Sequence, residues 1–355
     1  MNSSASNTPL RPQPIKPAGR VVSLKHRSRL LAGNALGDPV SREHPVYLPP
    51  GYEDTLHRYP VMWCLAAYTN AGPGQVNWRN HGENLPQRLD RLITAGKMPP
   101  VVVVFPDCYT SLGGNQYVNS SAIGHYADYL VDELIPAIDD AFRTIPEMAA
   151  RAVFGKSSGG FGALHLVMHR PNAFAAAASH AGDCGFDRVY ARDFPLTCDV
   201  LARHDGDIEH FVRTFWRDKR PGGAAFHTMM TLCLAASYSP EEGQPLGLRL
   251  PFDLRTCRLD EATWNRWLAF DPVVAAPEHA ESLKALAGLW IDAGSRDQYF
   301  IQYGTRQLTD VLRELGVEHH FDEFDGTHSG IDWRYDLSLP WLAERLKADV
   351  AGGTS

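Results

Sequence analysis

Short apolar runs alternate along this chain with longer segments whose apolar residues recur at helical spacing. Runs of strand length occupy residues 60–66, 101–106, 149–154, 175–179, 286–294 and 317–324. Between two of them, Tyr126 to Phe142 carries an apolar stripe at three- and four-residue spacing, which is typical of an amphipathic helix. Strands that alternate with helices form a mostly parallel sheet with helices on both faces. The pattern therefore predicts an α/β fold.

A serine between glycines lies where one of these runs meets a helix-like stretch. Gly155-Lys156-Ser157-Ser158-Gly159 follows the run 149–154 and precedes residues 162–168. A G-x-S-x-G pentapeptide in this context is typical of a nucleophile elbow, a sharp turn that exposes the serine hydroxyl. Glycines are expected at its flanks because side chains there would collide with strand and helix in a tight turn with positive φ. Ser157 is the candidate nucleophile.

Two other interpretations fit the pentapeptide alone. Gly155-Lys156-Ser157 also resembles a phosphate-binding loop, but that motif requires a glycine five residues before Gly155, where this chain has Ala150. The glycine-rich residues 158–162 would also loosen the helix start that cradles a phosphate. The second alternative is a glycine-rich turn without chemistry, and the residues that follow later in the chain argue against it.

An acid and a histidine follow the serine in the order that an α/β-hydrolase requires, each on a loop beyond a late strand. Asp297 lies just past the run 286–294, and His328 lies just past the run 317–324. The sequence therefore predicts Ser157 as nucleophile, His328 as general base and Asp297 as the acid that orients the imidazole.

Several other acids and histidines compete for these roles. Asp292 falls within a predicted strand and is expected to be structural, while Glu323 and Asp325 precede His328 too closely to orient its ring. The competing histidines lie in predicted strands, at a strand end, or on the helix behind the elbow: His165, His169, His180, His319 and His320.

Together these motifs resemble the esterase D or enterochelin-esterase-like family of α/β-hydrolases. The resemblance covers most of the chain, and it rests on the elbow with residues 160–164, on the loops of Asp297 and His328, and on segments 46–52, 59–61, 102–107, 117–120 and 132–139. It implies a Ser-His-Asp hydrolase of carboxylic or thio esters, with relatives that act on feruloyl esters, siderophore esters and S-formylglutathione. Neither a metal nor an organic cofactor is expected for this mechanism.

One segment departs from the family pattern. Such proteins usually carry a His-Gly pair after the third strand, whereas this chain has Leu65-Ala66-Ala67-Tyr68-Thr69-Asn70. The oxyanion donors expected here are the backbone N–H groups of Tyr68 and Ser158. Because a backbone donor does not depend on its side chain, the departure is compatible with activity.

The strand-helix rhythm stops from about Cys184 to Glu278, where hydrolases commonly carry a lid or cap. Helix-like patches occur at 208–216 and 225–236, and aromatic residues cluster near Trp264 and Trp267. One interpretation is a structural insertion, and the other is a cover that shapes the acyl pocket and excludes water. On the second interpretation Asn119, Trp264 and Trp267 are expected to line the substrate pocket.

Composition and charge narrow the partners. The net charge of −7 provides no basic surface for nucleic acid or anionic membrane, and no apolar run is long enough to cross a bilayer. The expected partner is therefore a small-molecule ester, and assembly into a homodimer is left open. The six cysteines lack a C-x-x-C pair, which argues against a zinc or dithiol site and indicates reduced thiols.

The ends of the chain complete the domain prediction. Residues 1–20 are polar and proline-rich without an apolar signal core, so they are expected to form a mobile tail of a cytoplasmic protein. Residues 21–350 are expected to form a single α/β-hydrolase domain with a cap at about 184–278. Two rivals to the hydrolase remain: an acyltransferase of the same fold with an alcohol acceptor, and an inactive ligand-binding relative.

Overall fold

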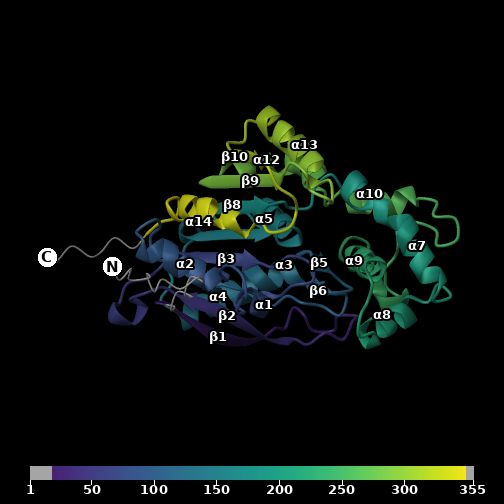
Figure 1. Cartoon of the computed structure of the whole chain (residues 1–355), viewed down its shortest axis with the longest axis horizontal. Helices are drawn as coiled ribbons and strands as arrows, with labels where there is room; N and C mark the ends of the chain where they lie inside the picture. The colour runs from purple at the N-terminus through teal and green to yellow at the C-terminus, as the bar shows by residue number, and fades with distance from the viewer. Residues whose placement is uncertain (1–17, 349–355) are drawn as a thin grey trace, which may run out of the picture.

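The computed structural model describes residues 18–348, and within them eight strands form one central sheet (Figure 1). Its strand order is β1-β2-β4-β3-β7-β8-β9-β10. Neighbours from β4 to β10 are parallel, whereas β1 and β2 join the edge in antiparallel pairs. The strands are β1 (Arg20–Arg27), β2 (Ser41–Leu48), β3 (Val61–Leu65), β4 (Val102–Val104), β7 (Arg151–Lys156), β8 (Ala176–His180), β9 (Gly288–Gly294) and β10 (His320–Phe324), with a separate pair β5 (Asn119–Ser120) and β6 (Gly124–His125).

Helices cover both faces of the sheet because successive side chains of a strand point to opposite sides. In β3, Met62 and Cys64 belong to the apolar cluster that also contains residues of α2 (Leu85–Thr94) and α14 (Tyr335–Ala343). Val61, Trp63 and Leu65 belong to the cluster on the other face, with residues of α4 (Ile135–Ala141), α5 (Ser158–His169) and α13 (Ile301–Glu314). All five side chains are buried, so the strand is apolar throughout rather than alternating.

The helices are α1 (Gly72–Gln75), α2 (Leu85–Thr94), α3 (Tyr126–Asp128), α4 (Ile135–Ala141), α5 (Ser158–His169), α6 (Phe186–Val189), α7 (Phe194–Ala202), α8 (Ile208–Arg217), α9 (Gly223–Tyr238), α10 (Glu261–Leu268), α11 (Pro272–Ala275), α12 (Ala280–Lys284), α13 (Ile301–Glu314) and α14 (Tyr335–Ala343). A π-helical stretch, Tyr129–Leu134, joins α3 to α4. Short 3-10 helices lie at Tyr52–Asp54, Met148–Ala150, Ala191–Asp193, Pro245–Gly247, Ala276–His279 and Asp332–Arg334.

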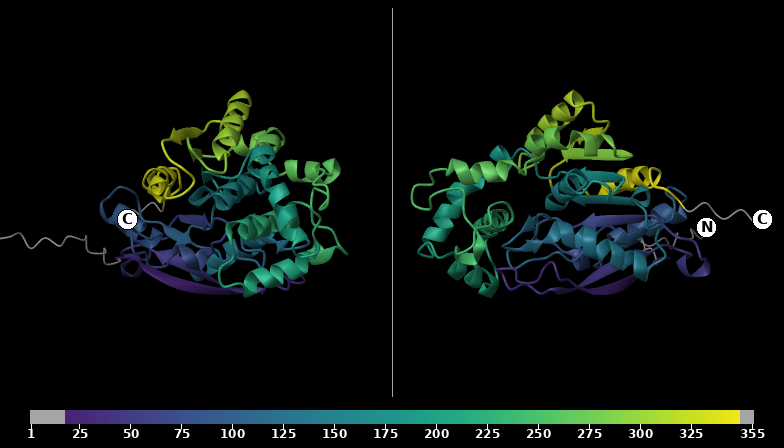
Figure 2. Two further views of the ribbon diagram at one scale, coloured as in Figure 1. Left: turned by 45° about the vertical axis from the view of Figure 1, so that its right-hand side comes forward. Right: turned by 180° about the vertical axis from the view of Figure 1, so that it is seen from behind.

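The segment without strand-helix rhythm folds into helices, with an irregular stretch at 239–260 that contains one short 3-10 helix. Its helices α7 to α10 gather beside the sheet, at the right of Figure 1. Figure 2 shows the same grouping from two other directions. Helix α9 carries an almost continuous buried surface from Thr228 to Tyr238, so the insertion has an apolar core of its own that is continuous with the main one.

The predicted α/β fold with a mostly parallel sheet is confirmed, and the differences are local. The run at 149–154 forms a strand two residues later than predicted, and the run at 317–324 pairs only from His320. The stripe at 126–142 is one helical segment with the π-helical turn inside it. Of the mobile tail predicted for residues 1–20, residues 1–17 lie outside the described residues. No helix within residues 18–348 has the length and apolar character needed to cross a bilayer.

Candidate active site

Ser157 lies on the sharp turn between β7 and α5. Its backbone has φ 55° and ψ −124°, a conformation that costs free energy for a residue with a side chain and is found mainly at functional sites. A Cβ on Gly155 would lie 2.5 Å from the backbone of Gly159, and one on Gly159 would lie 2.2 Å from the carbonyl oxygen of Leu65. The glycines are therefore required for close approach, and the positive φ expected of them falls on the serine instead.

The loops after β9 and β10 bring Asp297 and His328 together. Oδ2 of Asp297 lies 2.8 Å from Nδ1 of His328. A carboxylate only accepts, so Nδ1 carries the proton and Nε2 is left as the basic nitrogen. The other carboxylate oxygen accepts from the N–H of Tyr299 at 2.8 Å, and Gln298 accepts from the N–H of His328 at 3.0 Å. These contacts fix the tautomer and the position of the ring.

Ser157 and His328 line the same cavity, which has a volume of about 230 Å³. We call it the inner cavity. Its remaining lining comes from the turn after β3, from Lys156 and Asp183, from the insertion and from the start of α13: Ala67, Tyr68, Thr69, Val189, Tyr190, Asp193, Met230, Thr231, Leu234, Tyr299 and Ile301. Among the described residues no hydrogen bond joins Ser157 to His328, and such contacts are often long before substrate binds.

The serine hydroxyl instead contacts a carboxylate that sequence reasoning missed. Ser157 Oγ donates to Oδ1 of Asp183 at 3.3 Å, while Oδ2 accepts from Tyr190 at 2.9 Å and from Ser158 at 3.3 Å. Asp183 follows β8 by three residues, and polar residues just beyond the carboxyl ends of parallel strands commonly form binding sites. That signal was present in the sequence.

Asp183 is 1% exposed, and its burial has an electrostatic consequence. Burial raises the pKa of Asp183 to about 6, although the nearby charge of His328 and the hydrogen bonds from Tyr190, Ser157 and Ser158 favour the ionised form. The carboxylate is therefore kept at a cost in stability at neutral pH.

We expect Asp183→Asn to raise the free energy of unfolding above that of the wild type by more at pH 8 than at pH 4. The folded state holds the Asp183 proton up to about pH 6, whereas the unfolded chain loses it near pH 3.9, so the wild type loses stability as pH rises through that window. The asparagine has no proton to lose in this range, so the stability of the variant relative to the wild type should increase by on the order of 3 kcal/mol between the two pH values. Urea unfolding of both proteins at each pH measures it, and an equal difference between them at the two values would contradict the assignment.

The two N–H groups predicted to bind an oxyanion belong to Ser158 and Tyr68. Ser158 is the first residue of α5, so its N–H has no partner within the helix. Tyr68 lies in the turn after β3, and among the described residues its N–H makes no hydrogen bond. The turn is fixed by two contacts: Thr69 N–H donates to Gly113 O at 3.0 Å, and Tyr68 OH donates to Leu112 O at 2.9 Å. Both donors remain predictions.

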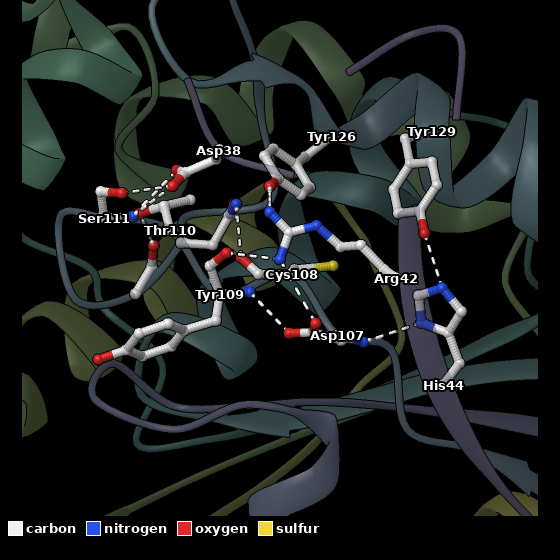
Figure 3. Close-up of polar contacts among 12 residues, drawn as sticks. Asp38, Arg42, His44, Asp107, Cys108, Tyr109, Thr110, Ser111, Tyr126 and Tyr129 are labelled. Atoms are coloured by element: carbon white, nitrogen blue, oxygen red, sulfur yellow. Dashed lines mark hydrogen bonds and ion pairs between the residues drawn. The ribbon is translucent and has the colours of Figure 1, made fainter. Parts of the chain in front are cut away.

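A buried polar network supports the segment that fixes this turn. Figure 3 shows the Arg42 guanidinium pointing from β2 into residues 107–111, where it donates to Tyr109 O at 2.7 Å and lies 3.4 Å from Asp107. It also donates to Tyr126 OH at 2.8 Å, and His44 Nδ1 accepts from the Asp107 N–H at 2.9 Å. The wall of the site is therefore attached to the sheet by charged and polar contacts.

The structure does not bring the predicted pocket residues to the inner cavity. Asn119 lies in β5, where its side chain accepts from the N–H of Asp128 at 3.0 Å. Trp264 and Trp267 pack inside the insertion with Phe194, and Trp267 is fully buried. These large aromatic side chains serve the core of the insertion itself, so their clustering in the sequence did not indicate a pocket.

A larger cavity of about 620 Å³ adjoins the inner cavity and shares Tyr68, Thr69, Met230 and Tyr299 with it. We call it the outer cavity. Its other lining is mostly aromatic or apolar: Tyr109, Gly113, Phe215, Trp216, Asp218, Pro221, Phe226 and His227. The cavity that holds Ser157 and His328 therefore adjoins a mostly apolar chamber bounded by residues of α8 and α9.

The competing acids lie in other environments. Asp292 is buried and contacts His180 Nδ1 at 2.9 Å and Arg334 Nε at 2.9 Å. Asp325 pairs with Arg296 on the surface, and Glu323 pairs with Arg306. Among residues 18–348, no three His, Cys, Asp or Glu side chains lie together so that they could hold a metal ion.

The chain is similar to known esterases along most of its length. The sequence profile of a family described as Putative esterase matches residues 39–340. Esterase MT1326 and Esterase Rv1288, from two strains of Mycobacterium tuberculosis, are each 33% identical over 322 residues, which is 87% of this chain and 57% of theirs. The chain thus spans little more than half the length of these curated relatives.

Solved structures share the fold. A ferulic acid esterase superposes with a TM-score of 0.59 at 19% identity, covering 92% of this chain and 99% of its own. An S-formylglutathione hydrolase from Agrobacterium tumefaciens superposes with a TM-score of 0.56 at 18% identity, covering 94% and 97%. At such identities the likeness concerns the fold, and the predicted α/β-hydrolase architecture is confirmed.

Proposed function

The chain belongs to the putative esterase family, and we propose that it is a serine hydrolase that cleaves carboxylic or thio esters through an acyl-enzyme. The observation that carries the proposal is the arrangement of three groups, two of which line the inner cavity. Ser157 sits on a strained turn, His328 lines the same cavity, and Asp297 contacts the far nitrogen of that histidine at 2.8 Å.

The chemistry proceeds in two halves. Ser157 Oγ attacks the carbonyl carbon while His328 Nε2 takes its proton, and His328 then gives that proton to the leaving alcohol or thiol. Water then attacks the carbonyl carbon of the acyl-enzyme while His328 takes one of its protons, and the acid leaves as His328 returns that proton to Ser157 Oγ. Asp297 keeps the imidazole tautomer and stabilises the imidazolium, and the N–H groups of Tyr68 and Ser158 stabilise the oxyanion.

A hydrolysis screen tests the activity directly. p-Nitrophenyl esters of increasing acyl length are to be compared with feruloyl esters and S-formylglutathione, the substrates suggested by the names of the structural relatives. Turnover of at least one ester class, with covalent labelling of the protein by a fluorophosphonate, is the expected result. The absence of both would contradict the proposal.

The insertion is proposed to act as a cover over the site within a single α/β-hydrolase domain. Its residues Val189, Tyr190, Met230, Thr231 and Leu234 line the inner cavity. Apolar walls of this kind exclude water from a reacting ester and so strengthen the electrostatic interactions inside.

We expect Trp216→Ala to change the ranking of ester substrates. Trp216 lines the outer cavity, is 49% exposed and donates its ring N–H to Ser111 O at 2.8 Å. Its removal takes away apolar contact with a chain in that cavity, so preference between esters that differ by small apolar groups should shift by about 1–3 kcal/mol. The kcat/KM values for a series of chain lengths measure the shift, while the melting temperature should change little.

Trp267→Ala is the matched control. Trp267 is fully buried and donates to Ser239 Oγ at 2.8 Å, so its truncation should cost about 3–5 kcal/mol of stability. Its substrate ranking should remain that of the wild type. An unchanged ranking in Trp216→Ala, or a shifted one in Trp267→Ala, would show that the outer cavity does not bind substrate.

We also propose a cytoplasmic location. All six cysteines are free, and five of them are buried within the fold. Free thiols are typical of reducing compartments. Cell fractionation with an antibody against the chain would test the location.

A further inference from the structure

The strongest unexplained feature of the site is the carboxylate beside the nucleophile. Asp183 lines the inner cavity, is almost completely buried, and does not belong to the predicted triad. A charged group in such a place is costly unless hydrogen-bond donors satisfy it. Its contacts therefore indicate what it is there to bind.

The two oxygens of this carboxylate differ in their partners. Oδ2 is bound by Tyr190 at 2.9 Å and by Ser158 Oγ at 3.3 Å, and Gln116 in turn donates to Ser158 Oγ at 2.9 Å. These contacts fix the rotation of the carboxylate. Oδ1 has a single long partner, the Ser157 hydroxyl at 3.3 Å.

That contact conflicts with catalysis as proposed above. A serine hydroxyl has one proton, so Ser157 cannot donate to Asp183 and to His328 at once. An acyl group with only carbon next to its carbonyl would either leave Ser157 on Asp183 or leave Oδ1 buried without a donor, and both outcomes cost free energy. A substrate that brings its own donor avoids the conflict.

We propose that Asp183 selects esters whose acyl group carries a hydroxyl or an ammonium group on the first or second carbon from the carbonyl. This donor replaces the Ser157 hydroxyl on Oδ1 and releases that hydroxyl to His328. The inference rests on the proposed hydrolase function and defines its substrate class.

The geometry of acyl transfer favours the acyl side over the alcohol side. In the tetrahedral intermediate on Ser157, the oxyanion faces the N–H groups of Tyr68 and Ser158, and the leaving oxygen faces His328, which protonates it. The acyl chain takes the remaining direction, and Asp183 is the carboxylate in contact with the Ser157 hydroxyl, at 3.3 Å. A negatively charged acyl group is excluded there because like charges repel strongly in a buried site.

The test compares matched p-nitrophenyl esters: butyrate, 3-hydroxybutyrate and 3-aminobutyrate, each corrected for its uncatalysed hydrolysis. For the wild type we expect kcat/KM for the hydroxy or amino ester to exceed that for butyrate by about 10- to 100-fold, the range for a hydrogen bond to a charged group. In Asp183→Asn the ratio should fall to about threefold or less, since the charge is lost.

Two further variants separate recognition from structure. Asp187→Asn alters an exposed carboxylate that lines neither cavity and is paired with Arg188 at 2.6 Å, and it should leave the ratio unchanged. Tyr190→Phe frees the rotation of the Asp183 carboxylate and should lower the ratio without abolishing it. A merely structural Asp183 would instead change all three esters equally.

The outcomes distinguish this inference from the function on which it rests. A wild type that hydrolyses all three esters equally, or an Asp183→Asn variant that retains the wild-type ratio, overturns the selection by Asp183 and leaves the hydrolase intact. A wild type that hydrolyses no ester and is not labelled by a fluorophosphonate overturns both.

Discussion

Ser157→Ala should lower kcat for ester hydrolysis by about 10⁶ while the protein stays folded. The change removes the only atom that forms the acyl-enzyme, and the methyl group that remains fits a turn whose shape is set by Gly155 and Gly159. The residual rate, about 10³–10⁴ over water, would come from the oxyanion donors and from binding alone. Steady-state kinetics with the best ester of the screen, together with circular dichroism, measures the effect.

Ser158→Ala is the control for this variant. It removes the neighbouring hydroxyl but keeps the backbone N–H that is proposed to bind the oxyanion. A fluorophosphonate should attach to Ser157 in the wild type and in Ser158→Ala, and mass spectrometry of the labelled peptide locates it. Labelling at Ser158, or wild-type turnover in Ser157→Ala, would show that the elbow has been assigned to the wrong serine.

The fold was predictable because its signals are local. A parallel strand buried on both faces appears as a short apolar run, and β3 and β7 were visible in the sequence for that reason. Strands β1 and β2 were not predicted from the pattern. The edge strand Arg20–Arg27 is half-exposed and carries many polar residues, and Ser41–Leu48, although mostly buried, begins with the polar residues Ser-Arg-Glu-His followed by a proline. The elbow was recognisable because its glycines satisfy steric demands at fixed spacing.

The pairing of Asp297 with His328 could be proposed from chain order, since parallel strands end at the same edge of the sheet. The shape of the pocket could not. Trp216 and Trp267 are the same residue type in the same insertion, yet one lines a cavity and the other is buried in a core. Tertiary packing decides between these two fates, and no pattern in the sequence distinguishes them.

Asp183 illustrates a different limit. Its position after β8 was compatible with a site residue, but its importance depends on contacts with Ser157, Ser158 and Tyr190. Helix α5 and strand β8 separate Ser157 and Ser158 from Asp183 in the sequence. These residues therefore come together only when β7 and β8 pair in register. A buried charge at such a junction is a cost to folding that a binding function explains.

Asp297→Asn should reduce kcat by about 10⁴ with little change in stability. The asparagine amide can donate to Nδ1 of His328, which favours the tautomer whose proton sits on Nε2 and removes the base from the side that faces Ser157. Because KM depends on the cavity lining, it should change much less than kcat. Stopped-flow acylation of the variant by a p-nitrophenyl ester isolates the step.

Asp292→Asn, the same substitution at the competing acid, should lower stability and leave turnover unchanged. Burial disfavours the charged form of Asp292, but the charges of His180 and Arg334 and the hydrogen bonds around the carboxylate lower the pKa of Asp292. Removing the charge takes from the buried Arg334 one of its two carboxylate partners, the other being Asp322, and should cost about 3 kcal/mol of stability, the low end for a broken buried ion pair. Since Asp292 contacts neither Ser157 nor His328, the folded fraction should retain wild-type turnover per labelled active site. If kcat fell by about 10⁴ in Asp292→Asn and stayed at the wild-type value in Asp297→Asn, the acid of the triad would have to be Asp292 instead.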